Sequence, residues 1–120
     1  MSVLYPLFVQ LDDRTMLAIE AQERILYHLE AIDIENDEYR FWDSTERPVH
    51  ISIAKNKVSS VSYAETGPSL QDAFLSYVDA VNLPRALVVG TPVEILRRIE
   101  NELRNRPKLK SWLFRLLHRD

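Results

Sequence analysis

The stretch LFVQLDDRTMLAI at residues 7–19 decides the fold of this chain. Apolar side chains alternate along both of its halves, which is typical of half-buried strands, and we expect strands over residues 3–11 and 15–20. A three-residue loop at residues 12–14 pairs Val9 with Leu17 and Leu7 with Ile19, so that all four lie on one face. A two-residue loop would divide them between the two faces. The pattern therefore predicts an antiparallel hairpin with the longer loop.

A second hairpin is predicted from VHISIAKNKVSSVSY at residues 49–63. Strands over residues 49–54 and 58–65, joined by a loop at residues 55–57, pair Ile51 with Val61 and Val49 with Tyr63. This register keeps the large side chains together. The polar side chains then face the other way, towards solvent or an edge, namely His50, Ser52, Ser60 and Ser62.

Helical periodicity marks four further segments. Ile25, Leu29 and Ile32 recur at helical spacing and predict a helix over residues 21–32. Ser69 resembles the first residue of a capping box, and its helix ends before Pro84. Thr91 and the proline after it begin another helix that runs to about residue 105. Pro107 interrupts it, and a last helix follows. Residues 33–37 are expected to form a loop, residues 38–43 a third strand, and residues 85–89 a strand or a buried connector.

These elements predict an α+β fold in one domain, residues 1–120. We expect an antiparallel sheet of four to five strands in the order β-β-α-β-β-β-α, helices packed on one face, and two C-terminal helices in a basic segment at residues 91–120. No internal repeat or long linker divides the chain.

Composition limits the chemistry. Hydrophobic residues make up 46 % of the chain and charged residues 28 %, as in soluble globular proteins. There is no cysteine, which excludes disulfides, a thiolate nucleophile and a sulfur-based zinc site, and fits a cytoplasmic location. No apolar run approaches the roughly 20 residues of a membrane span.

No local motif indicates an enzyme, a metal or a cofactor, so we assign no catalytic, cofactor-binding or metal residue. The three histidines, His28, His50 and His118, lie in different predicted elements. The acids of residues 33–37 alternate as in calcium loops, but the tight glycine turn is missing. An active site would have to be assembled from distant residues, and the candidates for it are His28, His50 and Asp43.

Charge is unevenly distributed along the chain. Residues 1–96 carry seven basic and 15 acidic side chains, whereas residues 97–120 carry eight basic and three acidic ones. A basic amphipathic helix can lie on an anionic membrane, contact nucleic-acid phosphates, dock in a partner, or fold back on its own acidic domain. The candidate interaction surface consists of Arg97, Arg98, Arg104, Lys108, Lys110, Trp112, Arg115 and Arg119.

Three functional hypotheses follow. The first is a small non-catalytic protein-interaction or accessory domain with a protein partner or a second copy of itself, as in a homodimer. The second is a protein that associates with membranes or nucleic acid through its basic C-terminal helices, although the net negative charge of the chain argues against nucleic acid. The third is an enzyme with a site assembled from distant residues.

Overall fold

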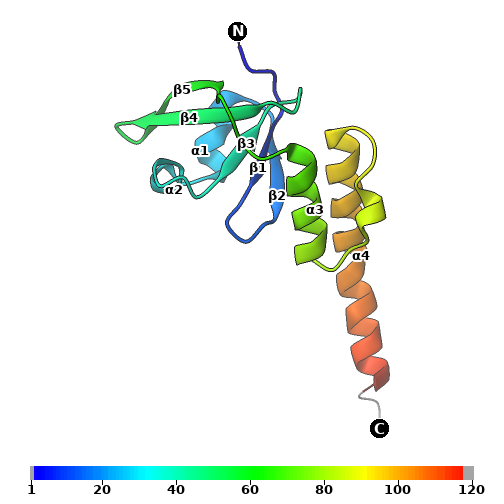
Figure 1. Ribbon diagram of the computed structural model, residues 1–120. Helices are drawn as coiled ribbons and strands as arrows, with labels where there is room; N and C mark the ends of the chain where they lie inside the picture. Colours follow the sequence, from blue (N-terminus) through cyan, green and yellow to red (C-terminus); the bar gives the residue numbers. More distant parts are fainter. Residues whose placement is uncertain (1, 118–120) are drawn as a thin grey trace.

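A five-stranded antiparallel sheet forms the centre of the protein, with strands in the order β2-β1-β3-β4-β5 (Figure 1). The computed structural model describes residues 2–117, and for residues 107–117 it describes the backbone only. Four α-helices and two short 3₁₀ helices accompany the sheet in this part of the chain. The predicted α+β class and antiparallel sheet are confirmed.

The first hairpin has the predicted register. Strands β1 (Leu7–Gln10) and β2 (Met16–Ile19) pair Leu7 with Ile19 and Val9 with Leu17. Both strands are shorter than expected, and Gln10 pairs with Met16 before the turn. Arg14 takes the left-handed conformation, with φ of 74°, which turns the chain.

Strands β3 (Arg40–Trp42), β4 (Pro48–Ala54) and β5 (Lys57–Tyr63) complete the sheet. The pairs Ile51–Val61 and Val49–Tyr63 are confirmed. The predicted loop of residues 55–57 is too long, because Ala54 pairs directly with Lys57. Lys55 and Asn56 both have positive φ, as a two-residue turn requires. The register shifts by one residue next to Ser52, so that Ser59 forms a β-bulge.

The helices cover both faces of the sheet, whereas the sequence pattern predicted that they would pack on one face only. One face packs Phe8 and Trp42 against α3 and α4. The opposite face packs Leu7 and Val9 against residues from α1 and α2. Both faces of the central strands are apolar, because Phe8 is as buried as its neighbours Leu7 and Val9, and each face needs its own cover.

The single helix predicted over residues 21–32 is instead a broken segment. The 3₁₀ helix η1 (Gln22–Arg24) leads into α1 (Ile25–His28), and Leu29 is extended before α2 (Ala31–Glu35) begins. Helices this short have little stability of their own, so packing decides their shape. The break buries Ile34 and leaves Ile32 61 % exposed, and part of the expected loop at residues 33–37 is therefore helical.

The C-terminal half contains α3 (Leu70–Ala80), the 3₁₀ helix η2 (Arg85–Leu87) and α4 (Pro92–Leu117). Both predicted helix starts are confirmed, since Ser69 Oγ accepts from the backbone N–H of Asp72 and Thr91 Oγ1 from that of Glu94. The two predicted C-terminal helices are one, because α4 continues through Pro107. A proline inside a helix removes the hydrogen bond to the carbonyl four residues earlier and its ring crowds that carbonyl, so the helix continues there at a cost of about 3 kcal/mol.

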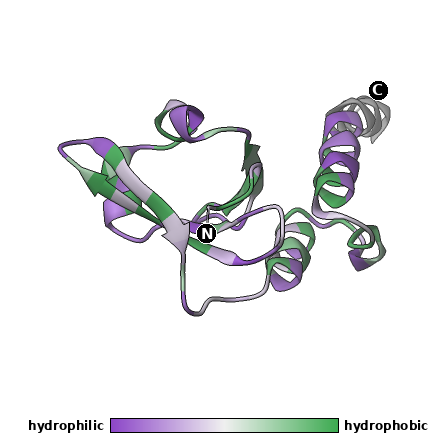
Figure 2. Cartoon of the chain, turned by 90° about the horizontal axis from the view of Figure 1, so that it is seen from above, coloured by the Kyte–Doolittle hydropathy of each residue, from purple (hydrophilic) through white to green (hydrophobic). Residues whose placement is uncertain are grey.

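The molecule is elongated, with extents of 59 × 31 × 20 Å. The first turns of α4 lie beside α3, and the rest of the helix projects past α3 and the sheet (Figure 1). At the other end, the β4–β5 hairpin reaches beyond the helices (Figure 2).

Candidate functional site

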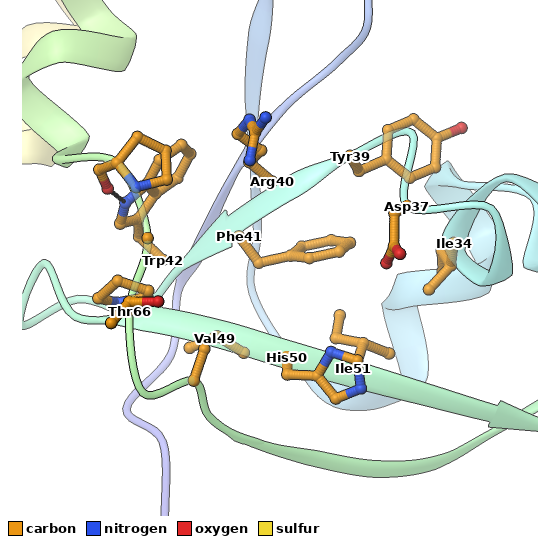
Figure 3. A pocket seen from close by; sticks show the side chains of 14 residues that line it. Ile34, Asp37, Tyr39, Arg40, Phe41, Trp42, Val49, His50, Ile51 and Thr66 are labelled. Carbon is orange, nitrogen blue, oxygen red and sulfur yellow. Dashed lines mark hydrogen bonds between the residues drawn. The ribbon is translucent and has the colours of Figure 1, made fainter.

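A cleft opens where β3 and β4 separate. The two strands pair at only two positions, Phe41 with Val49 and Trp42 with Pro48. Beyond these pairs, β3 leads back to α2 while β4 continues towards its hairpin, and a cavity of about 370 Å³ lies between them. Figure 3 shows the ring of Phe41 in this gap, with Ile34 and Ile51 beside it.

Besides Tyr39, whose hydroxyl donates to Asp33 at 3.1 Å, three ionisable side chains line the cleft, and they do not form a catalytic pair. Asp37, Arg40 and His50 are all exposed. Figure 3 shows Asp37 pointing into the gap and Arg40 pointing away from it. Among the described side chains, no hydrogen bond or ion pair joins these three groups. The cleft can admit a small polar molecule, but it lacks the positioned acid and base that proton transfer needs.

Asp43, directly after β3, is the one charged residue that is fully buried in the described part of the chain. Its Oδ1 accepts from the backbone N–H and the hydroxyl of Thr45, at 2.9 and 2.6 Å, and from the N–H of Arg47 at 3.3 Å. Its Oδ2 accepts from the N–H of Leu4 at 3.1 Å and from the hydroxyl of Tyr63. The carboxylate therefore joins the N-terminal segment, the β3–β4 turn and β5.

The charge of Asp43 is stabilised by these donors. Burial opposes ionisation, but the hydrogen bonds from Thr45, Tyr63 and Leu4 outweigh it and lower the pKa of the Asp43 carboxyl. The hydrogen bond between Tyr63 and Asp43 also raises the pKa of the Tyr63 hydroxyl. The Arg47 guanidinium lies 3.8 Å from the centre of the Tyr63 ring. With every lone pair engaged, this cluster is a structural junction and has no free group for a substrate.

The predicted basic surface is only partly available. Arg98 donates to the carbonyls of Leu87 and Val89, at 2.6 and 2.9 Å. Arg106, which is not one of the predicted residues but lies on the same helix, donates to the carbonyls of Val81 and Asn82 after α3. Both guanidiniums therefore bind backbone of the same chain.

The remaining predicted residues of this surface are placed as follows. Arg104 donates to the Asn101 side chain, and Arg97 is exposed without a hydrogen bond to another described side chain. Arg119 lies outside the described part of the chain. The side chains of four further residues also lie outside it, namely those of Lys108, Lys110, Trp112 and Arg115. Of the eight predicted residues, the structure describes the side chains of Arg97, Arg98 and Arg104 only, so the predicted surface stays a prediction.

The exposed hairpin is the surface that the sequence analysis did not select. On the α3 side of the sheet, the β4–β5 hairpin presents His50, Ser60 and Ser62 to solvent. Strand β5 is seven residues long and lies at an edge of the sheet, whereas the other edge strand, β2, has four residues. The period-two pattern revealed the exposed face, but strand order, which makes β5 an edge, could not be read from it.

Backbone groups of β5 also face away from the sheet. The N–H of Ala64 donates to the carbonyl of Pro48 at 3.0 Å, which makes this a hydrogen-bonded pair. Such pairs alternate along an antiparallel ladder, so the backbone groups of Ser62 point towards β4 and those of Val61 and Tyr63 point outwards. No backbone hydrogen bond joins these outward groups to another described segment.

Metal-binding clusters and membrane-spanning helices are absent from the described residues. No group of three or more His, Asp or Glu side chains there could hold a metal ion, and no helix there combines the length and apolarity needed to cross a membrane. No family model, curated protein or solved structure matches the chain.

Proposed function

We propose that this chain is a small non-catalytic protein-interaction domain that binds its partner through the outer edge of β5. The observation that carries the proposal is the outward-facing backbone of Val61 and Tyr63 on the longer edge strand. An extended polypeptide can add to such an edge as a further strand. The lack of cysteine supports a cytoplasmic location for this binding.

The surroundings of β5 favour binding over chemistry. The strand is exposed or half-buried along its whole length, so a partner can reach it without rearrangement. Edge strands are often protected by charges or bulges, and Lys57 and the Ser59 bulge lie in the half of β5 near the turn. Residues 60–64 keep a regular, accessible edge. The polar side chains of the cleft, by contrast, are not connected to one another.

Site-specific photocrosslinking in the source cells tests this proposal. A benzophenone amino acid replaces Ser62 beside the edge, and in a matched control it replaces Glu102 on α4; both residues are exposed. We expect the Ser62 position to form polypeptide adducts well above the Glu102 background. We also expect Val61→Pro to abolish them, because proline removes the outward N–H. Equal adduct formation at both positions would contradict the proposal.

A further inference from the structure

We infer that the partner of β5 is a second copy of this chain, bound antiparallel about a two-fold axis at Val61. This inference rests on the proposed function and names its partner. Since the backbone N–H and C=O of Val61 point outwards, two copies of Val61 can exchange a pair of hydrogen bonds, as in a hydrogen-bonded pair of an antiparallel ladder. The two sheets then form one continuous sheet.

The side chains of β5 match this arrangement. With Val61 opposite its own copy, Ser60 of each chain lies opposite Ser62 of the other, on the exposed face of the sheet. Paired β-branched residues and paired hydroxyls are both favourable across antiparallel strands. An isologous contact of this kind closes on itself and leaves no open edge at the junction.

Charge favours a second copy over an unrelated strand. Lys55 and Lys57 lie at the hairpin tip, and Glu65 follows the other end of β5. An antiparallel arrangement brings Glu65 of each copy to the hairpin tip of the other, near these two lysines. A parallel arrangement would place like charges together. The charges at the two ends of β5 are therefore complementary to those of a second, antiparallel copy.

Apolar surface beside the edge is also available. A hollow of about 360 Å³ lies there, and Leu26 and Val58 line it together with polar side chains of η1. Both apolar residues are only partly buried in the isolated chain. A second copy that extends the sheet would lie next to this hollow and remove apolar surface from water.

Sedimentation analysis of the purified full chain tests the inference. We expect a concentration-dependent dimer, and we expect Val61→Pro to leave a folded monomer. Val61→Thr is the matched control, because it keeps the N–H and the β-branched shape, and it should still dimerise. Circular dichroism verifies that both variants are folded. A wild-type monomer at millimolar concentration, or a dimer unaffected by Val61→Pro in its folded form, would overturn the inference.

A charge exchange provides a second test that does not alter the backbone. Glu65→Lys places a cation near Lys55 and Lys57 of the other copy, at both ends of the interface. We expect the dissociation constant of the dimer to rise by about tenfold at low salt. Adding Lys57→Glu to the same chain should restore much of the affinity. If the double variant dissociates as readily as the single one, the proposed antiparallel arrangement is wrong.

The two proposals fail in different ways. If the purified chain is monomeric while the crosslinker at Ser62 captures another polypeptide in cells, the second-copy inference is wrong and the interaction function stands. If the Ser62 position captures nothing above the Glu102 control and the chain is monomeric, both are wrong. A crosslinked adduct of twice the chain mass, lost in Val61→Pro, would support both.

Discussion

Asp13 and Asp43 form the same local turn in very different surroundings. Each is followed two positions later by a threonine, and each accepts from the backbone N–H and the hydroxyl of that threonine, Thr15 and Thr45 respectively. Asp13 is exposed at the tip of the first hairpin, whereas Asp43 is fully buried and has three further donors. The pair allows the contribution of the buried network to be separated from that of the turn itself.

Removing the buried carboxylate should be costly. Asp43→Ala leaves the N–H of Leu4, the N–H of Thr45 and the hydroxyl of Tyr63 without their acceptor, and we expect a loss of about 3 kcal/mol or more in the free energy of unfolding. Asp13→Ala, which removes the same turn in water, should cost less than about 1 kcal/mol. Urea denaturation of both variants measures the difference. Equal losses would show that the additional donors contribute nothing.

The same carboxylate makes stability depend on pH in the acid range. Because the pKa of Asp43 is lower in the folded chain than its ordinary value, its contribution is fully present above the unfolded-state pKa of about 3.9 and is lost as pH falls through the folded-state pKa. Asp43→Asn removes this titration. We expect the stability difference between wild type and Asp43→Asn to be constant near neutral pH and to shrink below about pH 4. Urea titrations at several pH values measure it, and a difference that grows on acidification would contradict the assignment.

The sequence could reveal only part of this junction. An aspartate followed by serine and threonine after a predicted strand favours a turn, so the local bonds of Asp43 are readable. Its bond with Tyr63 joins residues 20 positions apart and depends on how the two hairpins assemble. Tyr63 was correctly placed on the core side of the sheet, but periodicity does not identify its hydroxyl partner.

At the scale of elements, the hairpins were predicted well because their register follows from period-two alternation. A shift of one residue would have exposed Val9 or Ile51, and burial therefore determines the pairing. The segment at residues 21–35 was predicted poorly for the opposite reason. Ile25, Leu29 and Ile32 fit a helix, but burial of Ile34 against the sheet outweighs this weak local preference.

Arginines on α4 hold the preceding connector in place. Arg98→Ala removes two hydrogen bonds to the carbonyls of Leu87 and Val89, and we expect it to reduce the free energy of unfolding by about 1–3 kcal/mol. The neighbouring Arg97 is exposed, so Arg97→Ala should change stability by less than about 0.5 kcal/mol. Thermal or urea denaturation compares the two. A larger effect at Arg97 would mean that the connector is not held in this way.

At the scale of the whole molecule, the first turns of α4 complete one of the two core layers. Ile99 is fully buried, and Ile95 and Leu96 are nearly so, in the layer that contains Trp42 and Phe74. The sequence predicted the start of this helix correctly. It could not predict that the sheet is covered on both sides, because that depends on which strands lie at its centre.

Ile99→Ala tests this packing. Truncating a fully buried isoleucine leaves a cavity, and we expect a loss of about 2–5 kcal/mol in the free energy of unfolding. Val93, on the same helix, is 42 % exposed, and Val93→Ala should cost well under about 1 kcal/mol. Chemical denaturation measures both. Similar small losses in the two variants would show that α4 does not belong to the core.

The narrow connection between β3 and β4 divides the sheet into two unequal parts. Within the sheet, two residue pairs and the Asp43 hydrogen bonds join the β4–β5 hairpin to the three-stranded part, and Val49 and Ile51 add apolar contacts in the core layer of Leu7 and Val9. The hairpin can therefore open as a cooperative unit at lower free energy than global unfolding. In native-state hydrogen exchange, its amides should lose protection before those of β1, and Asp43→Ala should widen that gap. The strand pair with the fewest paired residues therefore determines where this sheet opens first.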